Sequence, residues 1–156
     1  MKKIIVGLLA LAMLVMVVGC DTTETPSGDP ENPSTTQEQV LVDNDVVKVT
    51  FIEIFEEPSI PNTCYVRLKV ENKSDNTVMV SLKDSYVNDT AQMMGTGVPI
   101  VLAPDKSSQQ PFFFGYSNLV ITDKSEISKI EFKVWLMDND TYDTVLETDS
   151  LTVNIE

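Results

Sequence analysis

From residue 40 onward, apolar and polar residues alternate with a period of two, and turn-forming residues interrupt the alternation at short intervals. This pattern predicts strands with one buried face and one polar face, and no stretch shows the period of an amphipathic helix. Val47, Val49 and Phe51 alternate in one phase, and Ile52 and Ile54 continue in the opposite phase. A phase change of this kind is typical of an extra residue in a strand, so we predict a β-bulge near Phe51.

Three later segments carry the clearest alternation. We predict that their core-facing residues are Cys64, Val66, Leu68 and Val70 in the first, Val78, Val80 and Leu82 in the second, and Ile130, Phe132, Val134 and Leu136 in the third. A polar turn at 72–76 separates the first two segments, which predicts that they pair as an antiparallel hairpin. The segment 112–114 is the most aromatic strand of the chain, and Phe113 faces outward if Phe112 and Phe114 point inward.

The turn signals divide residues 40–156 into about eight or nine short strands. Their connections vary in length, and several are long enough to cross between sheets. This favours an all-β, immunoglobulin-like sandwich of two antiparallel sheets over a closed barrel. The segment 121–128 fits either one helical turn or an irregular crossover.

The first twenty residues have the pattern of a secretory signal peptide. Lys2 and Lys3 precede an apolar run over residues 4–18, which is shorter than the roughly 20 residues that span a bilayer core. A small residue, Gly19, stands directly before Cys20 and favours cleavage over an uncleaved membrane anchor. The ending resembles the lipobox of bacterial lipoprotein signals, which implies that Cys20 is acylated through its thiol and becomes the mature N-terminus.

The predicted organisation follows from this start. Residues 1–19 form the signal, residues 20–39 form a lipidated cysteine followed by a disordered acidic linker, and residues 40–156 form the sandwich domain. The expected location is the outer face of the cytoplasmic membrane. Two or three acyl chains would hold the protein there durably, because each buried methylene contributes about 0.8 kcal/mol.

The charge limits the partners of this domain. The chain carries 24 Asp and Glu against 11 Lys and Arg, a net charge of −13. Such a surface repels nucleic acid, anionic lipid headgroups and phosphate polymers, so none of these is an expected partner. We expect contact with the membrane through the lipid anchor and with a protein of the cell envelope.

A family resemblance adds to this interpretation. The run from Tyr65 to Val80, the motif Tyr86-Val87-Asn88-Asp89 and the run from Ile127 to Val134 resemble the immunoglobulin-like domain of unknown function found in lipoproteins of Gram-positive bacteria. More distantly, the chain is similar to secreted immunoprotective-antigen sandwiches. The resemblance covers residues 46–155 and implies the sandwich fold and the surface location. It implies no catalytic residues.

The composition disfavours catalysis. The chain has no histidine, which removes the usual general base and the usual zinc ligand. Glu53, Glu56 and Glu57 are close in sequence, but a solvated strand end explains them better than a glycosidase pair. Cys64 lies in phase with core residues and has no partner cysteine once Cys20 is acylated, so we predict a buried structural thiol rather than a redox site. We predict that the protein is not an enzyme.

Two candidate sites remain. Asp138, Asp140 and Asp143 surround one turn and could supply oxygen ligands to calcium, although Asp and Asn are also ordinary turn residues. No other cofactor is expected.

The second candidate is an interaction surface. Tyr65, Phe113, Trp135 and Met137 fall on strand faces opposite the predicted core. The alternative is that both faces of a central strand are covered, or that Trp135 packs beneath a loop. The sequence thus predicts a lipid-anchored, non-catalytic binding module at the cell envelope, and its alternative is a calcium- or ligand-dependent sensor built on the acidic turns.

Overall fold

The structure, a computed structural model, describes residues 38–155. The predictions for the signal peptide, for Cys20 and for most of the linker lie outside the described residues. The first sheet, sheet A, contains β1 (Gln39–Asp43), β2 (Val47–Glu56), β3 (Thr63–Asn72), β7 (Ser107–Ser108) and β8 (Pro111–Gly115). The second sheet, sheet B, contains β4 (Val78–Val87), β5 (Thr90–Ala91), β6 (Ile100–Leu102), β9 (Lys129–Asp138), β10 (Thr144–Glu147) and β11 (Leu151–Asn154).

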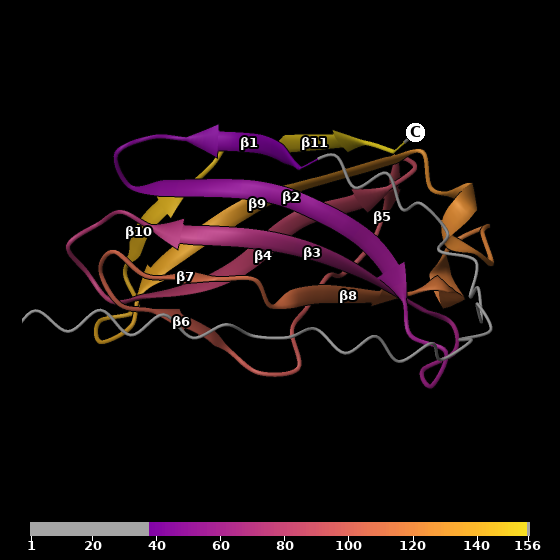
Figure 1. Ribbon diagram of the computed structural model, residues 1–156, viewed down its shortest axis with the longest axis horizontal. Helices are drawn as coiled ribbons and strands as arrows, with labels where there is room; N and C mark the ends of the chain where they lie inside the picture. Colours follow the sequence, from indigo (N-terminus) through magenta and orange to yellow (C-terminus); the bar gives the residue numbers. More distant parts are fainter. Residues whose placement is uncertain (1–37, 156) are drawn as a thin grey trace, which may run out of the picture. The chain divides into compact units, whose positions relative to one another are not determined.

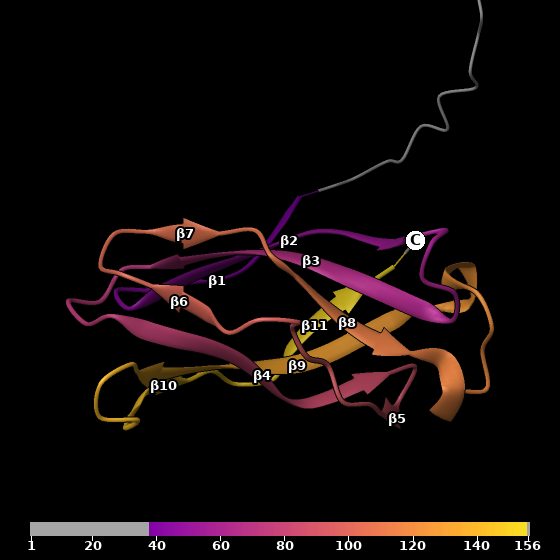
Figure 2. The same ribbon diagram turned by 90° about the horizontal axis from the view of Figure 1, so that it is seen from below.

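The two sheets lie face to face, and their strands pair in antiparallel fashion (Figures 1 and 2). Sheet A has the order β1-β2-β3, with β7 and β8 both pairing with the far edge of β3. In sheet B, β9 pairs with β4 on one side and with β10 and β11 on the other, while β5 and β6 pair with β4. The predicted two-sheet antiparallel sandwich is confirmed. The strands exceed the predicted number partly because β5 and β7, two residues each, are too short to show a period.

The predicted bulge in β2 is confirmed. The register between β2 and β3 shifts between Phe51 and Glu53. Before the shift, Val47, Val49 and Phe51 point into the core, and after it the phase is reversed. The reversal places Phe55 on the outer face of sheet A, opposite Tyr65 of β3. One extra residue therefore decides which side of the sheet receives an aromatic ring.

The predicted hairpin between β3 and β4 is wrong, because the two strands belong to different sheets. The turn at 73–77 carries the chain from one sheet to the other, and Asn72 at its start is 1% exposed. Its side-chain amide donates to the carbonyl oxygens of Asn76 at 2.8 Å and Leu102 at 3.0 Å. Its backbone N–H donates to the carbonyl of Lys106. These bonds satisfy buried polar groups at the crossover and connect it to the turn between β6 and β7.

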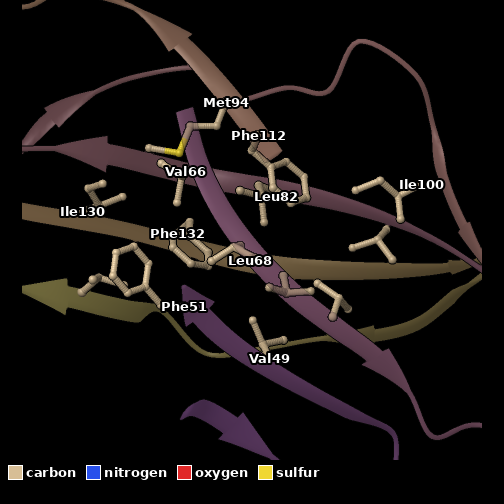
Figure 3. Packing of buried hydrophobic residues seen from close by; sticks show 14 of the residues in the cluster. Val49, Phe51, Val66, Leu68, Leu82, Met94, Ile100, Phe112, Ile130 and Phe132 are labelled. Atoms are coloured by element: carbon tan, nitrogen blue, oxygen red, sulfur yellow. The ribbon is translucent and has the colours of Figure 1, made fainter. Parts of the chain in front are cut away.

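The core lies between the sheets and consists of aliphatic and aromatic side chains from both (Figure 3). The predicted inward rows of β3, β4 and β9 are all buried, and so are Phe112 and Phe114 of β8. In Figure 3, Phe51, Val66 and Leu68 of sheet A face Leu82, Ile130 and Phe132 of sheet B. Burial of this apolar surface holds the sandwich together, at about 25 cal/mol per Å² removed from water.

The segment between β8 and β9 is an irregular crossover that contains two short 3₁₀ turns, η1 (Tyr116–Asn118) and η2 (Lys124–Glu126). Within this crossover, the side chain of Ile127 is buried. The Asp123 carboxylate caps η2 by accepting a hydrogen bond from the backbone N–H of Ser125. The Asn88-Asp89 turn between β4 and β5 adopts positive φ at both residues, as its sequence indicates. No helix in residues 38–155 is long and apolar enough to cross a membrane.

Candidate binding surface

Three aromatic side chains form a row across the outer face of sheet A. Phe55 of β2 lies opposite Tyr65 of β3, and Tyr65 lies opposite Phe113 of β8. The rings of Phe55 and Tyr65 stack with centroids 5.0 Å apart and planes 17° apart. The ring of Phe113 lies 6.1 Å from that of Tyr65, tilted by 54°. We call these three residues the aromatic row. Cross-strand aromatic pairs of this kind stabilise a sheet and also leave apolar surface available for contact.

A cation covers one end of the aromatic row. The guanidinium carbon of Arg67 lies 4.5 Å from the centroid of the Phe55 ring, and Arg67 also forms an ion pair with Glu53. Glu53 and Arg67 are direct cross-strand neighbours in the next row of the sheet. Because Arg67 is held by a carboxylate on one side and by a ring on the other, its position is defined. Aromatic and arginine side chains together are the residue types most enriched in binding hot spots.

Phe113 is the most accessible member of the row, with 39% of its surface exposed, whereas Phe55 and Tyr65 are half-buried. Its backbone exchanges hydrogen bonds with Gly95, at 2.8 and 3.1 Å. The bridge fixes the segment before β6 alongside β8, where Met93 is 88% exposed. The row therefore begins beside Arg67 and ends beside an accessible apolar segment.

The predicted interaction residues divide between two faces. Tyr65 and Phe113 lie on the outer face of sheet A, while Trp135 and Met137 lie on the outer face of sheet B. The Trp135 indole is half-buried. Its N–H donates to Thr144 Oγ1 at 3.0 Å, and the Lys83 ammonium lies 3.2 Å from the ring centroid. The strand alternation predicted the orientation of Trp135 correctly, but the four side chains do not form one surface.

A cleft of about 320 Å³ opens at the end of the sandwich next to the aromatic row. We call it the end cleft. It is lined by the end of β2, the loop between β2 and β3, the start of β3, and residues of η1 and η2; Figure 1 shows these segments at its right. Its lining consists of Glu56, Glu57, Pro58, Ile60, Pro61, Asn62, Thr63, Tyr116, Thr122 and Lys124. Two carboxylates and one lysine are thus among the lining residues.

Tyr116 connects the end cleft to the core. Its hydroxyl donates to Glu56 Oε1 at 2.5 Å, although the side chain is only 5% exposed. Burial and the neighbouring Glu56 carboxylate raise the pKa of Tyr116 above its ordinary value. Cys64, fully buried beside it, has a pKa raised to about 11, chiefly by burial. Its 0% exposure confirms the predicted burial of Cys64, and the raised pKa keeps the thiol protonated at neutral pH and a poor nucleophile.

The acidic turn at Asp138, Asp140 and Asp143 lies at the other end of the sandwich. The Asp138 carboxylate accepts hydrogen bonds from the backbone N–H groups of Asp140 and Thr141 and from the side-chain amide of Asn76. These backbone donors, Thr141 first, lower its pKa. Within residues 38–155, no group of three or more acidic, cysteine or histidine residues is arranged to hold a metal ion. Calcium binding at this turn stays a prediction.

Sequence reasoning missed two residues of this surface, Phe55 and Arg67. The signal for Phe55 was present, because the predicted bulge reverses the phase after Phe51 and so separates Phe55 from Ile54. Arg67 was recognisable as outward-facing, but its position over a ring depends on the pairing of β2 with β3.

No family model matches this sequence, and no curated protein sequence is similar to it.

Proposed function

We propose that this protein is a lipid-anchored lipoprotein on the outer face of the cytoplasmic membrane, and that its sandwich is a non-catalytic module that binds a protein of the cell envelope. The aromatic row on sheet A is the contact surface. One observation carries the proposal: Phe55, Tyr65 and Phe113 lie in register on three neighbouring strands, with Arg67 over the first ring.

The packing of the outer faces supports a role in recognition. Polar side chains are sufficient at the outward-facing positions of a sandwich that has no partner. The other half of the outer face of sheet A has such residues, with Lys48, Lys69 and Glu71 in ion pairs. An aromatic row beside that charged half divides the face into an apolar part and a polar part. Protein interfaces have this arrangement, with aromatic side chains in the centre and charged residues at the rim.

The N-terminal sequence supports the location. The signal-like residues 1–19, the lipobox ending at Cys20 and the resemblance to immunoglobulin-like domains of Gram-positive lipoproteins agree with one another. The linker that follows would hold the domain away from the membrane, with a coil dimension of roughly 25 Å. A module on such a tether can reach a partner that lies beside it in the envelope.

Cys20→Ala tests the anchor. We expect it to abolish metabolic labelling with a fatty acid and to release the protein from the membrane fraction or leave it unprocessed. Cys64→Ala is the matched control, because it removes the other cysteine of the chain and should leave labelling unchanged. Equal labelling and equal membrane retention of the Cys20→Ala protein would contradict the anchor.

Photo-crosslinking in intact cells tests the contact surface. A photoreactive phenylalanine analogue at position 113 should give a discrete adduct, while the same analogue at Val101, which is exposed on the outer face of sheet B, should give none. Tyr65→Ala should reduce the adduct from position 113. If positions 113 and 101 give the same products, or if Tyr65→Ala changes nothing, the aromatic row is not the contact surface.

A further inference from the structure

We infer that the end cleft and the aromatic row form one continuous site, in which the end cleft binds a lysine or arginine side chain of the partner protein and the aromatic row contacts the apolar residues beside it. The inference rests on the proposed function and adds the chemistry of the partner segment. It predicts a basic segment with apolar flanks.

The two features are joined by the strands that build them. Glu56, which lines the end cleft, ends β2 opposite the buried Cys64, so its side chain turns to the inner side of sheet A, and Thr63 is the cleft-lining residue on the face of the aromatic row. Thr63 lies two residues before Tyr65 on the same face of β3 and pairs with Gly115 of β8, two residues after Phe113. An extended segment that lies across the rings therefore needs to advance by only one cross-strand row to reach the mouth of the cleft.

The charges in the end cleft favour a cation. Glu56 and Glu57 line it, and neither forms an ion pair within residues 38–155. The Tyr116 hydroxyl occupies one oxygen of Glu56 and holds that carboxylate in place, so an incoming cation meets an ordered acceptor. Lys124 lines the cleft as well and opposes the cation. The glutamates should therefore raise the affinity for a cation and Lys124 should lower it, and substitutions can separate the two effects.

The charge of the whole protein argues against a second copy of the chain as the occupant. The net charge is −13, so two copies repel each other before their surfaces meet. Among the described cations, Lys106 and Lys124 alone lack an ion pair, which leaves few groups that could neutralise a neighbouring copy. A basic segment has the complementary charge and gains from the same field.

The ring geometry argues against a saccharide. Sugar rings bind to open faces of aromatic side chains, but Phe55 and Tyr65 stack nearly parallel at 5.0 Å and cover each other's faces. Arg67 covers part of the Phe55 ring. The rings therefore expose their edges to solvent, and ring edges can pack against aliphatic and aromatic side chains of a polypeptide.

The test is a titration of the isotopically labelled full chain in neutral detergent, followed by amide NMR. The probe is a capped tetrapeptide of alternating leucine and arginine, and the reference peptide has glutamate in place of arginine. We expect saturable shifts at the non-proline residues of 57–62, at residues 122–124 and around Phe113 with the arginine peptide alone. Glu57→Gln should weaken its binding about fivefold, and Lys124→Gln should strengthen it about threefold.

Two matched variants measure the general effect of charge. Asp105→Asn removes a carboxylate from the turn between β6 and β7, and Lys106→Gln removes the other cation that lacks an ion pair within residues 38–155. Both lie outside the end cleft, and each should change the affinity by less than twofold. If Asp105→Asn weakens binding as much as Glu57→Gln, the peptide is attracted by net charge alone and the inference is wrong.

The remaining outcomes separate the inference from the proposed function. Binding of the glutamate peptide with equal affinity, or shifts confined to the Asp138–Asp143 turn, would overturn the cationic site. Self-association that saturates the same amides without peptide would identify a second copy as the occupant instead. If Glu57→Gln leaves the cellular adduct from position 113 intact while Tyr65→Ala abolishes it, the aromatic row remains the contact surface and only the cationic chemistry fails.

Discussion

At the scale of single residues, Trp135 shows how one side chain can be neither core nor open surface. Its strand alternation points it outward, yet Lys83 covers the indole ring and Thr144 accepts its N–H. The cation–π contact contributes roughly 0.5–1 kcal/mol at a site that remains partly exposed. The residue therefore supports the packing of β4, β9 and β10 on the outer face of sheet B.

Trp135→Ala should lower the free energy of unfolding by about 1–2 kcal/mol, between the values for an exposed and a core tryptophan. Denaturant unfolding, followed by circular dichroism, measures the change. Lys83→Met is the matched control, because it keeps most of the covering stem and should alter the indole emission with a smaller loss of stability. A loss above about 3 kcal/mol for Trp135→Ala would show that the indole is part of the core.

Cys64 should be inert in the native state. It has no exposed surface, and burial raises its pKa to about 11. In the Cys20→Ala protein it is the sole thiol, so alkylation at pH 8 should be undetectable in buffer and complete in denaturant. Because the folded pKa lies above the unfolded value, the associated stability is full below the unfolded pKa and falls as pH rises toward 11. Stoichiometric labelling of the native protein within minutes would contradict this burial.

At the scale of elements, Asn72 joins the crossover between β3 and β4 to β6, because its buried side-chain amide donates to carbonyls on both. Asn72→Ala should lower the free energy of unfolding by about 2–3 kcal/mol, since the carbonyls of Asn76 and Leu102 lose their shared donor. Thermal and denaturant unfolding measure the loss. Asn154→Ala, at an exposed position of β11, removes the same group from the surface and should cost under about 0.5 kcal/mol. Equal effects of the two substitutions would remove the special role of Asn72.

The bulge in β2 and the crossover after β3 differ in how visible they are in the sequence. A bulge reverses the local phase of apolar residues, so the change from Phe51 to Ile52 and Ile54 predicted it. The turn at 73–77 has the same polar composition whether it joins paired strands or strands in opposite sheets. The hairpin prediction was wrong because a local pattern does not specify the strand with which β3 pairs.

At the scale of the whole molecule, the acidic side chains should govern the response to pH. The pKa values of Asp43, Asp84, Asp123 and Asp138 are lowered, by Lys73, by Lys133, by the backbone of Ser125 and by the backbone of Thr141, respectively. A folded pKa below the unfolded value contributes stability that is present above the unfolded pKa and is lost as pH falls through the folded one.

The midpoint of thermal unfolding should therefore fall as pH decreases below about 4. Asp138→Asn should flatten this decline, because an amide oxygen can still accept from the turn backbone but does not titrate. Asp75→Asn, which removes an equal charge from a carboxylate that accepts no hydrogen bond among the described residues, should leave the slope unchanged. A decline that is identical in both variants would mean that net charge, and not these contacts, controls acid unfolding.

Properties that depend on neighbours along the chain could be predicted from the amino-acid sequence. The alternation of side chains specified which face of each strand is buried, including Cys64 and the inward rows of β3, β4 and β9, and it predicted the all-β sandwich. These follow from the period of a strand and from the removal of apolar surface from water, both of which are local.

Which outward-facing residues contact one another became visible only in the folded chain. The fold places Tyr65 and Phe113 together with Phe55 and Arg67, and it separates them from Trp135 and Met137 on the other sheet. The fold also gathers Glu56, Glu57 and Lys124 in the lining of the end cleft. Alternation assigns a side chain to the inner or outer side of its own strand, but contacts between strands depend on pairing and register, which arise when the chain closes long loops to form two sheets.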